Sequence, residues 1–238
     1  MSFAVRIASA SGGSGASSLA AGVASALSLM SFSVLCVDLC GGGGSIAPLL
    51  CREELPVYNV GDVLCGRCDV RDAIIEVSPT LSILSAAERM EQAEPSSMAQ
   101  LSQLLAAGEY GFDYVVYDTP SFLSEHELAM SDQSGLTVIS MLAERHSVER
   151  AAKRGRILRR NERLDVRFVI NRFSASDARR RDEFDDLDAV TDSVGVRLLG
   201  VVPEIGSKDA FSINQKGAYT RIAQRILGQA VPIGDEIG

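Results

Sequence analysis

Short apolar runs rich in valine and isoleucine alternate along this chain with longer segments in which apolar residues recur at helical spacing. Continuous apolar strands separated by helices are typical of a parallel sheet that is covered on both faces. Strands are predicted at Ala4–Ala8, Val34–Val37, Leu81–Leu84, Tyr114–Tyr117, Leu136–Met141, Val166–Ile170 and Leu198–Val202. Helices are predicted at Ser17–Met30, Val70–Ile75, Ser97–Ala107, Ser147–Arg160, Asp185–Ser193 and Ala218–Leu227.

These elements predict an α/β fold: a single doubly wound, mostly parallel sheet of about seven or eight strands with helices on both faces. Ser97 and Ser147 stand where helix N-caps are expected. The 238 residues, 46% of them hydrophobic, suffice for one large domain, and no repeat or Pro-rich linker divides them. A single domain over residues 1–238 is therefore expected, with its ligand at the carboxyl ends of the strands.

The charge of the chain is unevenly placed. A formal net charge of −8 argues against a general nucleic-acid binder. Residues 150–163 nevertheless hold seven Lys and Arg side chains, and residues 179–181 are three arginines followed at once by an acidic run over 182–188. Two interpretations stay open for the basic segment 150–163: a solvated helix face, or a surface for anionic lipid, DNA or an acidic partner.

The cysteines and the apolar runs indicate the cellular compartment in which the protein is expected. No stretch approaches the roughly 18 apolar residues of a membrane span, and the N-terminus lacks a signal-peptide pattern. Five scattered cysteines give no disulfide framework, so a cytoplasmic protein is expected. Cys65 and Cys68 have metal-ligand spacing without a second pair nearby, which favours free thiols over a metal shared across a dimer.

The segment between the first predicted strand and helix reads Ala10-Ser11-Gly12-Gly13-Ser14-Gly15-Ala16-Ser17-Ser18. A strand, a glycine-rich turn and a helix give the context of a phosphate site, because turn N–H groups and the helix N-terminus attract anions. In the usual loop a lysine reaches the β- and γ-phosphates, and here Ala16 takes its place. The predicted nucleotide-binding residues are Gly12, Gly13, Ser14, Gly15, Ala16, Ser17 and Ser18. The alternative is an ordinary strand-to-helix turn.

Two carboxylates close buried strands, Asp38 after Val37 and Asp118 after Tyr117. A carboxylate at the end of a core strand is costly unless it is paired, hydrated or beside a metal. Near a phosphate loop they predict Mg²⁺ held through water, with the Ser17 hydroxyl as direct ligand, whenever nucleotide binds. Asn171 ends a third strand, where its amide could read an adenine edge.

The order of these segments resembles the MinD/ParA group of deviant Walker-A ATPases over nearly the whole chain. The resemblance rests on Ser11 to Ser18 (SGGSGASS), Asp38-Leu39-Cys40, Asp118-Thr119-Pro120, Asn171-Arg172, Leu199 to Glu204 (LGVVPE) and Asn214 to Gly217 (NQKG). Gly66 to Asp69 and the tail from Ile222 to Pro232 are similar to the MinD branch. The resemblance implies a P-loop NTPase of the SIMIBI type that binds ATP or ADP with Mg²⁺. It places Asn171, Arg172 and Pro203 on the adenine side.

Three departures from the family pattern bear on activity. Ser11 replaces the signature lysine that crosses to a partner subunit, Ala16 replaces the loop lysine, and Cys40 replaces the aspartate that positions water. Hydrolysis is therefore expected to be absent or very slow, and no catalytic residue is assigned. For the nucleotide site, weak ATP or ADP binding, a permanently empty site and a different anion all stay open.

The resemblance favours a MinD-like pseudo-ATPase that acts as a scaffold or spatial regulator, for instance at division sites. The alternatives are a pilus-assembly localisation protein of the same superfamily, and an active ATPase completed by a partner's cation. A protein partner is expected, and any homodimer should be independent of ATP because Ser11 cannot cross over. The acidic ending over residues 231–238 lacks a basic amphipathic face, so the family's membrane anchor is not expected. Peripheral membrane location through a partner remains compatible with the chain.

Overall fold

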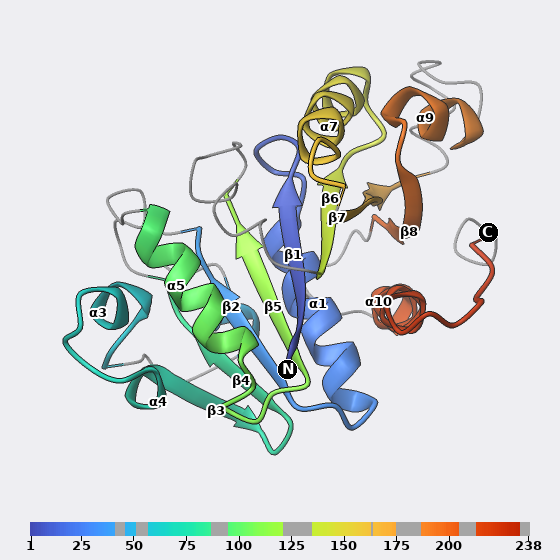
Figure 1. Cartoon of the computed structure of the whole chain (residues 1–238). Coiled ribbons are helices and arrows are strands. Elements are labelled where there is room, and N and C mark those ends of the chain that lie inside the picture. Colours follow the sequence, from blue (N-terminus) through green and yellow to red (C-terminus); the bar gives the residue numbers. More distant parts are fainter. Residues whose placement is uncertain are drawn as a thin grey trace.

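The described residues form one eight-stranded sheet with the order β3-β4-β2-β5-β1-β6-β7-β8 (Figure 1). This computed structural model describes residues 1–40, 46–50, 57–86, 95–120, 135–162, 164–174, 187–204 and 213–233. The strands are β1 Phe3–Ser9, β2 Val34–Asp38, β3 Ile74–Ser78, β4 Leu81–Leu84, β5 Tyr114–Thr119, β6 Gly135–Met141, β7 Leu164–Phe173 and β8 Arg197–Pro203. Every neighbouring pair is parallel except β3 with β4, which confirms the predicted fold class.

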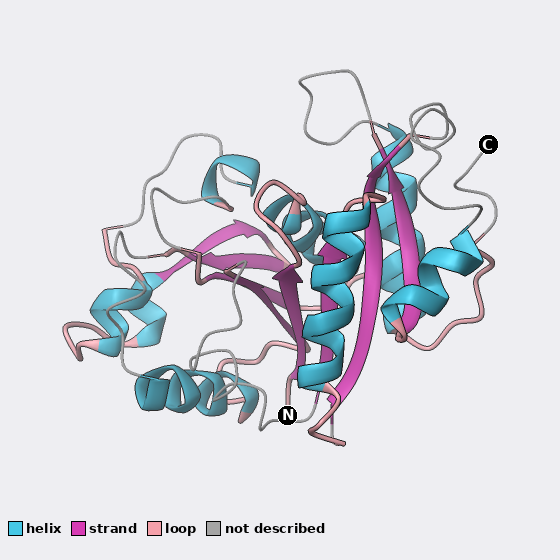
Figure 2. Ribbon diagram, turned by 90° about the horizontal axis from the view of Figure 1, so that it is seen from above, coloured by secondary structure: helices cyan, strands magenta, loops and turns pink. Residues whose placement is uncertain are grey.

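Helices cover both faces of the sheet (Figure 2). One face packs against α1 Ala16–Leu29, α2 Ala47–Leu50 and α10 Ile213–Ile226. The other face packs at one end against α3 Val60–Leu64, α4 Val70–Ala73 and α5 Pro95–Ala106, and at the other end against α7 Arg145–Leu158 and α9 Leu187–Val194. Because both faces are buried, the central strands carry continuous apolar runs. None of the described helices is long and apolar enough to cross a membrane.

The predicted helix Val70–Ile75 is wrong in its last two residues. Helix α4 ends at Ala73, and Ile74 begins the edge strand β3, which runs antiparallel to β4. The residues Ile74-Ile75-Glu76-Val77 are mostly β-branched, which suits a pleated strand better than a helix. The strand was missed because it follows the helix directly, without a turn residue between them.

Neither of the two serines predicted to cap a helix is an N-cap in the structure. Helix α5 begins at Pro95, a residue suited to a first helical turn, so Ser97 lies inside it. Glu144 is the N-cap of α7, and Ser147 lies in the first turn, where its Oγ accepts a hydrogen bond from the Leu142 N–H at 3.0 Å. Helix α10 begins five residues before the predicted Ala218, and the first two residues of the predicted helix Asp185–Ser193 lie outside the described residues.

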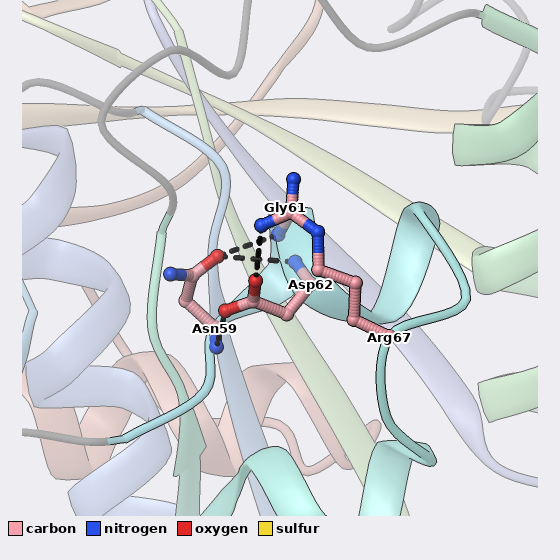
Figure 3. Close-up of polar contacts among 4 residues, drawn as sticks. All are labelled: Asn59, Gly61, Asp62 and Arg67. Carbon is pink, nitrogen blue, oxygen red and sulfur yellow. Dashed lines mark hydrogen bonds and ion pairs between the residues drawn. The ribbon is translucent and has the colours of Figure 1, made fainter.

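Helix α3 has a complete side-chain cap (Figure 3). The Asn59 side chain accepts hydrogen bonds from the N–H groups of Gly61 at 2.9 Å and Asp62 at 3.3 Å, and Asp62 accepts one from the Asn59 N–H at 3.1 Å. Arg67 pairs with the same Asp62 carboxylate at 2.9 Å. The cap stabilises this short helix by about 1 kcal/mol and ties the Gly66–Asp69 segment to it.

Candidate functional site

The loop after β1 keeps the backbone conformation that glycine allows. Gly13 and Gly15 have φ angles of 80° and 73°, and Gly15 is the N-cap of α1. A Cβ atom at Gly15 would lie 2.6 Å from Nδ2 of Asn171, whereas one at Gly12 would meet nothing within 4 Å. The chain therefore needs glycine at position 15, both for its left-handed conformation and for its close contact with β7.

Serine hydroxyls connect the loop to the protein interior. Ser14 is fully buried, and its hydroxyl lies 2.6 Å from that of Ser9. Ser140 on β6 donates to the Ser14 carbonyl at 2.9 Å, and the Ser11 hydroxyl lies 3.3 Å from that of Ser147 on α7. The Ser14 hydroxyl thus points into the protein, so a phosphate would meet the backbone of the loop at this position. Gly12 and Gly13 are exposed, and Ser17 and Ser18 are half-buried.

Asn171 lies against the loop. It is 3% exposed, and its Nδ2 donates to the carbonyls of Ser14 and Gly15, each at 3.0 Å. Its Oδ1 accepts from the Arg172 N–H at 3.0 Å. Both amide hydrogens therefore have acceptors within the protein. These contacts give Asn171 a structural role in holding the loop, and its role toward adenine stays a prediction.

The other two predicted adenine-side residues lie at the ends of neighbouring strands. Arg172 on β7 has a φ of 53° and pairs with Glu204 at 2.8 Å. Pro203 is the last residue of β8, and its register partner on β7 is Phe173. The structure therefore brings Asn171, Arg172 and Pro203 to one edge of the sheet, and the Arg172 stem lies beside the loop, 3.9 Å from where a Gly15 Cβ would be.

Arg154 is a cation that the sequence reasoning misplaced. It was grouped with the basic segment 150–163, yet its side chain on α7 is buried, and its Nη1 donates to the Ser9 carbonyl at 2.7 Å. Its Nη2 donates to the Pro120 carbonyl at 3.4 Å. Arg154 thus joins the start of the phosphate loop to the end of β5. Helical spacing from the buried Ala151 and Leu158 was the available signal.

The rest of the basic segment lies mostly on the surface. The exposed cations of α7 and the residues just after it are Arg145, Arg150, Lys153, Arg156, Arg159 and Arg160. Arg159 donates to the Gly195 carbonyl at 2.7 Å. Arg163 and residues 179–186 lie outside the described residues. Both interpretations of this surface remain compatible with its exposure.

Asp38 and Asp118 are register partners at the carboxyl ends of β2 and β5, and both are buried. The Asp38 carboxylate accepts hydrogen bonds from the N–H groups of Cys40 at 2.9 Å and Ile46 at 3.2 Å. The Cys40 thiol hydrogen-bonds to Asp118 and to the Ser17 hydroxyl. Burial raises the pKa of Cys40 far above its usual value, and the charges of Asp118 and Asp38 raise it further. The thiol is therefore protonated at neutral pH.

The structure brings the predicted metal-binding residues Ser17, Asp38 and Asp118 together. Cys40, which was not predicted as a metal ligand, lies beside them. Ligand atoms of Asp38, Cys40 and Asp118 lie within 4.8 Å of one another, and the thiol contact adds Ser17. The Ser17 hydroxyl and the two carboxylates offer the oxygen ligands that Mg²⁺ prefers, and they are the residues that would hold it beside a bound phosphate. The thiol of Cys40 is a soft group that Mg²⁺ does not favour. This donor set therefore fits Mg²⁺ only in its oxygen atoms.

The pair at metal-ligand spacing, Cys65 and Cys68, lies elsewhere. Cys65 is exposed and Cys68 is half-buried, and both are free thiols in this structure. Within the residues that the structure describes, the group of three potential metal ligands contains neither of them. Their role remains a prediction.

A mostly parallel sheet with a glycine-rich loop between its central strand and the following helix is an arrangement found in nucleotide-binding α/β folds. The chain belongs to the family described as CobQ/CobB/MinD/ParA nucleotide binding domain, whose model matches residues 5–212.

Septum site-determining MinD proteins are among the relatives. The protein of Bacillus subtilis is 24% identical over 247 residues, covering 98% of this chain and 92% of its own length. The protein of Helicobacter pylori is 27% identical over 253 residues, which cover 97% of this chain and 92% of the relative's length.

Solved MinD structures share the fold. MinD in the MinC:MinD cell division protein complex of Aquifex aeolicus superposes with a TM-score of 0.85 at 20% identity, covering 97% of this chain and 98% of that one. The septum site-determining protein MinD of Pyrococcus horikoshii, complexed with Mg-ADP, gives a TM-score of 0.79 at 22% identity, covering 95% and 96%. At these identities the likeness establishes the fold.

Proposed function

We propose that this chain is a MinD-like pseudo-ATPase that acts as a scaffold or spatial regulator, for instance in positioning the division septum. The observation that carries the proposal is the chemistry of the loop: its glycine backbone is intact, while Ser11 and Ala16 stand where the family has lysines. The likeness to MinD proteins supports the regulatory role.

The charge balance of the site opposes tight binding of a polyphosphate. A hydrogen bond to a charged group contributes about 1.5–3 kcal/mol, so the loss of the loop lysine at Ala16 weakens ATP binding by about 10- to 150-fold. Asp38 and Asp118 remain buried close by, and no lysine in the loop offsets their negative charge. Binding of ATP or ADP with Mg²⁺ is therefore weak and not required for the fold.

Turnover is affected more than binding. The loop lacks the lysines that would stabilise transition-state charge, and Cys40 is bonded to Ser17 and Asp118 in place of a carboxylate that could position water. The Ser11 hydroxyl, which lies 3.3 Å from Ser147, cannot reach a partner's phosphates. These substitutions support the loss of both hydrolysis and ATP-driven dimerisation.

The proposed function places the protein in the cytoplasm, where it acts together with a protein partner. The exposed cations of α7 offer a surface to an acidic protein, an anionic membrane or DNA. Any homodimer forms without ATP. A pilus-assembly localisation protein with the same degenerate loop would show the same biochemistry, so the two roles are separated by the partner that co-purifies with the chain.

Light scattering with and without Mg-ATP tests the proposal. The oligomeric state should be the same in both conditions, and addition of a co-purifying partner should not produce ATP turnover. A monomer that dimerises only with Mg-ATP would contradict the pseudo-ATPase proposal. Turnover that appears only with the partner would establish the rival, an ATPase completed in trans.

A further inference from the structure

Side chains that could bind a metal ion, including a cysteine, meet at the carboxyl ends of β2 and β5. The carboxylates of Asp38 and Asp118 and the sulfur of Cys40 offer atoms within 4.8 Å of one another. Asp38 and Asp118 are 1% and 0% exposed, and Cys40 is half-buried. Three donors from two adjacent strands thus point into one small volume beside the loop.

The contacts of these residues hold the donors in place. Two backbone N–H groups, of Cys40 and Ile46, orient the Asp38 carboxylate. Each carboxylate oxygen has two lone pairs, so these bonds leave Asp38 able to accept a cation as well. The Cys40 thiol already bridges Asp118 and the Ser17 hydroxyl. The backbone N–H groups on Asp38 are of the kind that orient metal ligands in proteins, while the thiol contacts place Cys40, Asp118 and Ser17 beside one another.

The electrostatics favour a cation at this point. Asp38 and Asp118 are register partners on neighbouring parallel strands, so their side chains leave the same face of the sheet, where two negative charges repel one another. The loop beside them, residues 10–18, contains neither lysine nor arginine. A bound divalent cation would offset the repulsion between the two carboxylates and would bind without a nucleotide.

We propose that Asp38, Cys40 and Asp118 bind a thiophilic divalent cation of the Zn²⁺ class, with the Ser17 hydroxyl or a water as fourth ligand. Zn²⁺ takes four ligands from sulfur and oxygen at about 2.0–2.3 Å, which sets ligand atoms roughly 3–4 Å apart. Small side-chain movements within the 4.8 Å group achieve this spacing. On binding, the cation displaces the thiol proton of Cys40, which passes to the solvent, and a Zn–sulfur bond forms.

The choice of cation follows from the sulfur atom. An aspartate at position 40 would complete an all-oxygen set suited to Mg²⁺ or Mn²⁺, whereas a thiolate selects softer metals. This site is independent of ATP turnover and goes beyond the proposed regulatory role. The substitution that removes a catalytic carboxylate therefore also creates a different metal preference.

Metal titration of the full chain tests this site. The protein is stripped with a chelator and titrated with Zn²⁺, and with Co²⁺ as a spectroscopic probe of thiolate ligation. We expect one equivalent per chain and a thiolate-to-Co²⁺ charge-transfer band. Cys40→Ser should weaken Zn²⁺ binding by at least about 100-fold, since loss of an outer contact alone costs 10- to 100-fold, and should abolish the band.

Two further variants sharpen the result. Cys65→Ser, at an exposed thiol, should leave affinity and band unchanged. Cys40→Asp should lose the band and bind Mn²⁺ more tightly than the unmodified chain does, with circular dichroism confirming that each variant is folded. No Zn²⁺ binding by the unmodified chain, equal binding by Cys40→Ser, or a band lost in Cys65→Ser would each overturn the proposal. None of these readouts depends on nucleotide, so they stand apart from the test of the pseudo-ATPase.

Discussion

The phosphate loop and the carboxyl ends of β2 and β5 lie at the same site, and they differ in the charge that they carry. The loop has the backbone of a phosphate site, with left-handed Gly13 and Gly15, and its residues 10–18 include neither lysine nor arginine. The strand ends keep both carboxylates, Asp38 and Asp118, in adjacent register. One side of the site thus has the shape of a phosphate loop without a cation, while the other side carries two buried carboxylates.

This difference shows that shape and charge in a nucleotide site are separable. The geometry of the loop is fixed by contacts with the core: Asn171 donates to two of its carbonyls, and Arg154 donates to the Ser9 carbonyl at the end of β1, just before the loop. Those contacts are needed for folding whether or not phosphate binds. Side chains that serve only a ligand can be replaced without loss of the fold.

Restoring charge on both sides gives the largest expected effect. In the triple variant Ser11→Lys, Ala16→Lys, Cys40→Asp, we expect phosphate release to rise by at least about 1000-fold, because transition-state charge stabilisation and water positioning each contribute orders of magnitude. The matched control adds Asp118→Ala to the triple variant and should stay at background. A folded triple variant that binds Mg-ATP without turning it over would break the comparison.

The loop lysine alone should restore binding. Ala16→Lys should tighten Mg-ATP binding by about 10- to 150-fold, the equivalent of one charge-assisted hydrogen bond, as measured by isothermal titration calorimetry. Gln100→Lys adds the same charge at an exposed position of α5 and serves as the control. Equal gains in both variants would mean that general charge, rather than the loop position, limits binding.

Arg154 should matter for stability although it lies in a basic surface segment. Arg154→Met removes the donors to the Ser9 and Pro120 carbonyls and should lower the free energy of unfolding by about 2 kcal/mol. Arg150→Met, at an exposed position of the same helix, should change it by less than about 0.5 kcal/mol. Urea denaturation measures both, and similar values for the two would contradict the buried role of Arg154.

The smallest expected effect separates two glycines of the loop. Gly15→Ala forces a Cβ into a left-handed residue and against Asn171, and should cost about 1–2 kcal/mol of folding free energy. Gly12→Ala meets nothing within 4 Å and should be nearly neutral in the same denaturation experiment. A neutral Gly15→Ala would show that the loop backbone is adaptable rather than fixed.

Hydrophobic runs predicted most of the fold, because buried parallel strands are apolar throughout their length. The edge strand β3 was missed since it is half-buried and follows α4 without a turn residue. Both N-cap assignments failed because α5 already begins at Pro95 and the N-cap of α7 is Glu144. A local rule identifies residues that can cap a helix, but tertiary packing decides where the helix starts.

The sequence predicted which residues meet at the site, but not the hydrogen bonds that their side chains make. The convergence of Ser17, Asp38 and Asp118 follows from strand order, since carboxyl ends of neighbouring parallel strands meet at one edge. The hydrogen bonds of Asn171 to the loop and the burial of Arg154 depend on side-chain direction, which motif spacing does not encode. The same is true of the Cys40 thiol between Ser17 and Asp118.

Phosphate release by the pure, unmodified chain tests the central claim most directly. The rate with Mg-ATP is compared with that of Asp118→Ala, prepared identically, so that contaminating activity is the same in both. We predict that the two rates are equal, because the unmodified site lacks the charged groups that turnover requires. A rate near that of ordinary MinD/ParA ATPases, abolished by Asp118→Ala, would contradict the account.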